Sequence, residues 1–154
     1  MKRLKKAALA MIVIFAAAQL VRPGRANPAT DPSRTIQAHV GTSNGLITIL
    51  DRSCRDCHSN ETVWPWYTQV APVSWLMASA VSKGRNAVNF SEWSTYTQTQ
   101  QEQLLAASCD ETSSGRMPGV WTVLHPEARL SSQDIKTICG ANGGTHHDES
   151  NTRN

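Results

Sequence analysis

The sequence predicts an all-α domain, a bundle of about four short helices joined by long loops. Three observations predict this class. Apolar residues recur at helical spacing in several segments, capping signals precede two of those segments, and no stretch alternates in the manner of a half-buried strand. The chain has 154 residues, 40% of them apolar and 18% charged, which suits one domain with its own core.

The first two helices are predicted from apolar spacing. Within 45–58, four residues recur at intervals of three, four and three: Ile47, Leu50, Cys54 and Cys57. A helix there places all four on one face. A second series follows Pro72, a residue that suits a first helical turn: Val73, Leu76, Met77, Ala80 and Val81. This pattern stops near Gly84, where we expect the helix to end.

The last two helices are predicted from capping signals. Thr99 and Glu102 have the spacing of a capping box ahead of an apolar series, Leu104, Leu105 and Cys109. Ser131 and Asp134 repeat this spacing before Ile135, Ile138 and Cys139. Gly140 then ends the fourth helix.

The N-terminus has the pattern of an export signal. Met1–Lys6 is basic, and the next 15 residues are apolar except for Gln19. Fifteen residues fall short of the roughly 20 that a membrane-spanning helix needs. Small residues at 16–18 and 24–26 suit cleavage, while a short uncleaved anchor has the same appearance. Both interpretations stay open, and we expect a periplasmic protein, soluble or tethered to the inner membrane by this segment.

Composition divides the chain into four parts. We expect a signal peptide or anchor over 1–26, a proline-rich linker over 27–34, the folded domain over 35–140 and a polar flexible tail over 141–154. Six basic residues precede the first acid, whereas the chain from position 27 holds nine Lys or Arg against twelve Asp or Glu. The domain is therefore mildly acidic, which argues against nucleic-acid binding.

The strongest motif is Cys54-Arg55-Asp56-Cys57-His58, because C-x-x-C-H is the attachment signature of c-type haem. Two thiols at this spacing each form a thioether with a haem vinyl group, and His58 then binds the iron. We predict one covalently attached haem c. Three alternatives compete for these residues: a thiol redox pair, a tight disulfide, and a zinc site shared with Cys109 and Cys139.

The sixth iron ligand separates an electron carrier from a protein that binds small molecules at the iron. Met117 is our first candidate, because it lies in the loop segment 115–119, where its thioether can reach the far face of the haem. His125 is the second candidate. Four other side chains fit core packing or solvent exposure better: Met77, His39, His146 and His147.

Further residues are predicted to support the haem site. Cys109 and Cys139 remain once the motif takes the other two cysteines, and in an oxidising compartment we expect them to form a disulfide. Arg85 and Arg116 are candidates to pair with the haem propionates. The aromatic residues after the motif are candidates for the haem walls, with core packing as the alternative: Trp64, Trp66, Tyr67, Trp75, Trp93 and Trp121.

Three stretches resemble the bacterial haem-binding domain proteins that carry a single C-x-x-C-H motif. They are CRDCHSNETVWPWYTQVAPVSWLMASAVSKGRNAVNFSEW at 54–93, MPGVWTVLHPEARLSSQDIKTIC at 117–139 and QLVRPGRANP at 19–28. The resemblance implies a cytochrome c-like bundle around one haem, located in the cell envelope and often tethered by its N-terminal segment. It also favours Met117 as the distal ligand. The chain departs from the family pattern at Trp121, where a tyrosine is usual, and after Cys139, where an aromatic residue is common.

These observations predict a function in electron transfer. We expect a c-type cytochrome with His-Met iron ligation that exchanges single electrons with a redox partner protein, and not an enzyme. The acidic surface suits a basic patch on that partner. The alternative is a haem-based sensor or small-gas-binding protein in which Met117 is labile or does not bind the iron.

Overall fold

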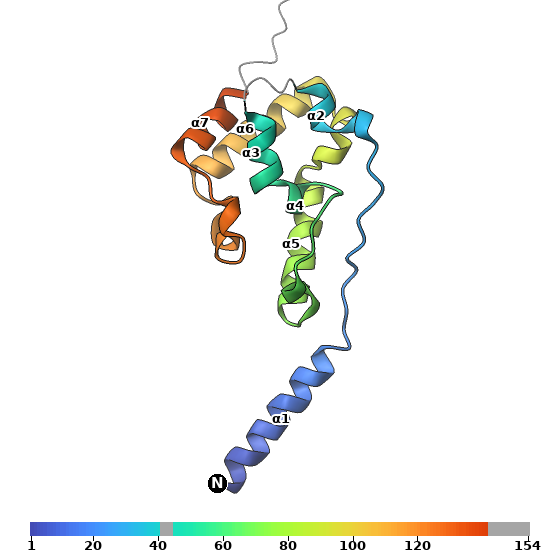
Figure 1. Ribbon diagram of the computed structural model, residues 1–154, viewed down its shortest axis with the longest axis vertical. Helices are drawn as coiled ribbons and strands as arrows, with labels where there is room; N and C mark the ends of the chain where they lie inside the picture. The colour runs from blue at the N-terminus through green and yellow to red at the C-terminus, as the bar shows by residue number, and fades with distance from the viewer. Residues whose placement is uncertain (41–44, 142–154) are drawn as a thin grey trace, which may run out of the picture.

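The computed structural model describes residues 1–40 and 45–141, and it contains no strand in those residues (Figure 1). Its α-helices are α1 (Lys2–Ala18), α2 (Ile36–His39), α3 (Leu46–Ser53), α4 (Arg55–His58), α5 (Val73–Ala87), α6 (Gln98–Ser113) and α7 (Ser132–Gly140). Short 3₁₀ turns are η1 (Pro32–Arg34), η3 (Trp66–Gln69), η4 (Phe90–Thr95), η5 (Gly119–Val123) and η6 (Pro126–Ala128). The all-α prediction is confirmed. The predicted tail beyond Ala141, with His146 and His147, lies outside the described residues.

One apolar core joins α2, α3, η4, α6 and α7. Trp93 is its largest member and is only 1% exposed. The other buried members are Ile36, Leu46, Ile49, Leu50, Val88, Phe90, Leu105 and Ile138. Below this core, α5 with η3 and the loop over 115–130 extend side by side in the view of Figure 1. The core therefore supports two projecting parts of the chain.

The segment predicted as one helix over 45–58 is broken at Cys54. This residue has φ −126° and ψ −30°, outside the helical region, so α3 ends at Ser53 and α4 begins at Arg55. The single-face prediction for 45–58 is therefore wrong. Leu50 is buried in the core, whereas Cys54 and Cys57 are half-buried at its edge. The break redirects the four residues of α4 toward α5.

Gly84 does not end the second predicted helix, because α5 continues to Ala87. A Cβ atom at position 84 would lie 2.9 Å from the carbonyl carbon of Cys57 and 3.2 Å from its Cβ. Real side chains do not approach a backbone this closely, so glycine is required where α4 and α5 cross. Gly84 is therefore a site of close packing between α4 and α5 and not the helix terminator that the sequence predicts.

The capping box of α6 lies two residues earlier than predicted. Thr97, not Thr99, is the N-cap: its hydroxyl accepts from Gln100 N, and the Gln100 side chain accepts from Thr97 N at 2.8 Å. The preceding Tyr96 stacks edge-on against Trp93, so the chain enters the helix directly after this anchored ring. For α7 the predicted box of Ser131 and Asp134 is confirmed.

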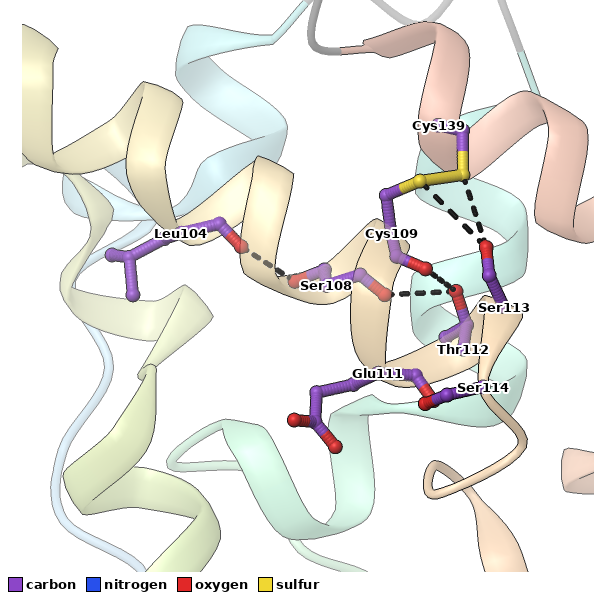
Figure 2. Close-up of a disulfide and its surroundings, with 8 residues drawn as sticks. All are labelled: Leu104, Ser108, Cys109, Glu111, Thr112, Ser113, Ser114 and Cys139. Atoms are coloured by element: carbon purple, nitrogen blue, oxygen red, sulfur yellow. Dashed lines mark hydrogen bonds between the residues drawn. A yellow bond between two sulfur atoms is a disulfide. The ribbon is translucent and has the colours of Figure 1, made fainter.

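Cys109 and Cys139 form a disulfide between α6 and α7, as predicted, with Cα atoms 4.7 Å apart. Figure 2 shows Ser113 beside both sulfurs, its Oγ 3.8 Å from Cys109 Sγ and 3.5 Å from Cys139 Sγ. A bridge across 30 residues stabilises the fold by about 3 to 4 kcal/mol in the chain-entropy model. It closes the base of the loop over 115–130.

The segment after α1 is bound to the domain along its length. We call residues 19–29 the strap. Trp75 Nε1 donates to Val21 O at 2.8 Å, and the Asn27 side chain donates to Thr62 O at 2.9 Å. Arg85 donates to Ala26 O and to Asn27 Oδ1. α1 itself buries no residue, and none of the described helices combines the length and apolar character needed to cross a membrane.

Replacing Gly84 with alanine should lower the free energy of unfolding by about 2 kcal/mol, because the added methyl group collides with the Cys57 backbone. Denaturant unfolding followed by circular dichroism measures this loss. Gly140→Ala is the control, since a Cβ there meets nothing within 4 Å and should change stability by less than about 0.5 kcal/mol. If the two substitutions lowered the free energy of unfolding equally, the close contact between Gly84 and the Cys57 backbone would be refuted.

Candidate functional site

A cleft opens between α3–α4 and the loop over 115–130. About 630 Å³ of space, open solvent included, lies between its walls. Its lining residues are Arg52, Ser53, Cys54, Asp56, Cys57, His58, Thr112, Met117, Pro118, Trp121, His125, Glu127, Ala128 and Leu130. The same cleft is therefore lined by Cys54, Cys57 and His58 of the motif and by both candidate distal ligands, Met117 and His125.

Cys54 and Cys57 are free thiols on one wall of the cleft. Burial raises the pKa of the Cys54 thiol to about 12, and burial also raises the pKa of Cys57. Reactive redox cysteines have a lowered pKa, so this environment is unlike that of a thiol oxidoreductase. The two sulfurs are not bonded to each other, which also speaks against the tight disulfide.

His58 ends α4 and is held by the backbone that follows α5. Its Nδ1 lies 3.2 Å from the Val88 carbonyl oxygen, which can only accept, so Nδ1 carries the proton. Burial lowers the pKa of His58 and keeps the imidazole neutral. Nε2 therefore retains a lone pair for a metal, with the orienting hydrogen bond that metal-binding histidines usually have.

Met117 reaches the cleft from the opposite wall. Its backbone N donates to Glu111 O at 3.1 Å, at the end of α6. Two glycines with positive φ frame it, Gly115 at 72° and Gly119 at 56°, a conformation that side chains disfavour and that turns the loop sharply. The Met117 side chain is 42% exposed. Its thioether is thus supplied by a turn and not by a packed helix.

His125 also lines the cleft, but both of its ring nitrogens have partners. Nδ1 lies 3.3 Å from Glu127 Oε1, and Nε2 lies within hydrogen-bonding distance of the Tyr67 hydroxyl at 3.1 Å. We call the Tyr67–His125 hydrogen bond the clasp, because it joins η3 to the loop over 115–130. A histidine engaged in this way must break a contact before it can bind iron, so the geometry favours Met117 over His125.

Several predicted supporting residues lie elsewhere. Of the tryptophans, only Trp121 lines the cleft. Arg85 donates to Ser59 O at 2.7 Å and to the strap, and Arg116 makes two hydrogen bonds with Glu111. Neither arginine lines the cleft, so the predicted propionate pairing is not supported.

A zinc site does not fit the cysteines. Cys109 and Cys139 are bonded to each other, and no group of three or more His, Cys, Asp or Glu side chains in residues 1–40 and 45–141 is arranged to share a metal ion. The donors that face the cleft include two thiols, the imidazoles of His58 and His125, and the Met117 thioether. These residue types can bind a haem.

The sequence does not predict the roles of two residues at the site. It indicates Tyr67 only as a candidate for the haem walls, and it indicates no role for Glu127. The clasp joins residues 58 positions apart, a contact that no local spacing indicates. The nearby Glu127, two residues after His125, was the one local signal that this imidazole has a partner.

The family model described as haem-binding domain matches residues 13–140 of the chain. The match begins within α1 and includes the strap, the motif and the loop over 115–130. No curated protein and no solved structure matches the chain.

Removing the clasp should loosen the cleft. Tyr67→Phe deletes only the hydroxyl, and we expect the free energy of unfolding to fall by about 1 kcal/mol, the usual net value of one hydrogen bond. Urea unfolding measures the loss. Trp66→Phe serves as the control because this neighbouring side chain is 78% exposed. A loss no larger than that of the control would show that the clasp contributes nothing.

Proposed function

Because the chain belongs to the haem-binding domain family, we propose that it is a c-type cytochrome that carries one covalently attached haem and transfers single electrons. The observation that supports this proposal best is the set of donors around the cleft. The thiols of Cys54 and Cys57 and the imidazole of His58 lie on one wall of the cleft. The thioether of Met117 reaches the cleft from the opposite wall.

Cys54 and Cys57 attach the cofactor in this proposal. Each thiol adds across one haem vinyl group, so that a carbon–sulfur bond forms and the thiol hydrogen passes to the neighbouring vinyl carbon. No oxidant is needed. Both cysteines are free, so no competing disulfide has to be reduced first.

His58 and Met117 bind the iron from opposite sides. When bound, the haem supplies an iron that changes charge by one electron. His58 keeps its orientation through the Val88 carbonyl, and Trp121 and Leu130 give the cleft an apolar lining. An iron that keeps both ligands in both redox states needs little rearrangement, and methionine ligation tends to raise its potential.

We place the protein in the periplasm, soluble or tethered to the inner membrane by α1. The basic start of α1, followed by its apolar residues, has the pattern of an export signal, which directs the domain out of the cytoplasm. The mildly acidic domain suits transient docking to a basic redox partner. We assign no catalytic reaction, and we propose no nucleic-acid partner.

A second candidate function is a haem-based sensor or small-gas-binding protein. The 42% exposure of Met117 and its position on a glycine-framed turn support it, because a ligand held in this way can leave the iron more easily than one fixed on a packed helix. The two candidates differ in whether the ferrous iron of the native protein binds carbon monoxide.

The test of the proposed function is covalent haem. We expect protein produced in a host that matures c-type cytochromes to keep one haem after denaturation, seen as a stained band and as an intact mass increased by one haem. The double variant Cys54→Ser, Cys57→Ser should lose the stain. Colourless parent protein with the mass of the polypeptide alone would overturn the proposal.

The distal ligand is tested by a pair of substitutions. Met117→Ala should give a high-spin ferrous iron that binds carbon monoxide, because it removes the sixth ligand. His125→Ala should keep the low-spin absorption spectrum of the parent, since His125 is engaged with Tyr67 and Glu127. The reverse outcome would identify His125 as the ligand. Rapid carbon monoxide binding by the parent protein would favour the sensor.

A further inference from the structure

Exposed apolar side chains gather at one end of the domain. Outside residues 1–18, every large apolar side chain that is exposed in the described residues falls in one of three segments, 20–21, 63–76 and 117–124. The most exposed are Leu20 at 84% and Trp66, Val120 and Val123 at 78% each. None lies on α2, α3, α6 or α7. We call the three segments the apolar end.

Hydrogen bonds connect the three segments. Trp75 Nε1 donates to Val21 O at 2.8 Å, and the Tyr67 hydroxyl lies 3.3 Å from Leu124 O. In Figure 1 the turn before α5 and the loop over 115–130 both extend from the core toward the side on which α1 lies. The apolar side chains therefore belong to one end of the molecule, next to the point where α1 leaves it.

The apolar end is also uncharged. No Asp, Glu, Lys or Arg occurs in 62–82 or in 117–124, although 18% of the whole chain is charged. The strap adds two cations at its edge, the exposed Arg22 and the half-buried Arg25, and the Arg25 guanidinium donates to Thr68 O at 2.9 Å. An exposed apolar patch of this kind marks an interaction surface, because water-facing surfaces of soluble domains are mixed with charge.

We propose that the apolar end rests on a lipid bilayer, in the boundary between headgroups and acyl chains. This inference rests on the tether proposed above. α1 leaves the domain at this end, buries no residue and begins with four basic residues. Tryptophan favours the membrane interface, and Arg22 and Arg25 match anionic headgroups. The lipid surface thus continues the apolar surface that α1 begins.

The orientation has a consequence for the cleft. Met117, Pro118 and Trp121 belong both to the apolar end and to the cleft lining. With that end on the bilayer, this wall of the cleft lies beside the headgroups. Only partners located at the membrane surface can then reach the cleft from this edge.

Lipid photocrosslinking tests the orientation on the full-length, haem-loaded protein. The protein is reconstituted in vesicles of phosphatidylethanolamine and phosphatidylglycerol that contain a diazirine phospholipid, and the adducts are mapped by mass spectrometry. We expect adducts in 63–76 and 117–124 as well as in α1. Adducts confined to residues 1–21, or equally frequent on α6 and α7, would overturn the inference.

A pair of variants adds a matched control. Val123→Glu and Gln103→Glu each add one negative charge at an exposed position, the first in the apolar end and the second on α6. Val123→Glu should lower the adduct yield in 117–124 about fivefold, because a charge at the interface opposes lipid contact. Gln103→Glu should leave it unchanged, and equal yields from the two variants would refute lipid contact.

The absorbance of bound haem is recorded on the same samples. Adducts at the apolar end of a colourless protein would support the membrane orientation and overturn the proposed cytochrome. A haem-loaded protein without those adducts would support the proposed cytochrome and overturn the membrane orientation.

Discussion

The crossing of α4 and α5 is the contact on which the site depends. Gly84 lets the α5 backbone lie against the carbonyl of Cys57, where no larger residue fits. Because α5 can continue past this point to Ala87, the Val88 carbonyl comes within hydrogen-bonding distance of His58. One backbone contact thus sets the directions of two thiols and of an imidazole that lie next to each other in the sequence.

The opposite wall of the cleft is held differently. The loop over 115–130 contains only short turns and contributes one buried apolar side chain, Ala128. It is fixed at its base by the Cys109–Cys139 disulfide and at its tip by the clasp to Tyr67. Few apolar contacts mean that this loop opens at lower cost than the core unfolds. Of the two candidate functions proposed above, electron transfer requires this loop to stay closed, and binding of small molecules at the iron requires it to open.

The distribution of charge gives the domain two unlike ends. The buried core and the charged helices occupy one end, and the uncharged segments around η3 and η5 occupy the other. The strap binds to the uncharged end through backbone carbonyls of both the strap and the domain, so α1 is not attached through a free linker. In the proposed function, the same end holds the Met117 side of the cleft and faces the membrane.

Local patterns determined what depends on neighbours in the chain. The helical class, the Ser131 capping box and the C-x-x-C-H motif follow from spacings of a few residues, which the sequence displays directly. The tertiary structure decided the rest: the break at Cys54, the role of Gly84, and the partners of His125. The contact of Gly84 with Cys57 and that of His125 with Tyr67 join residues 27 and 58 positions apart, and packing between such segments leaves no periodic trace in the sequence.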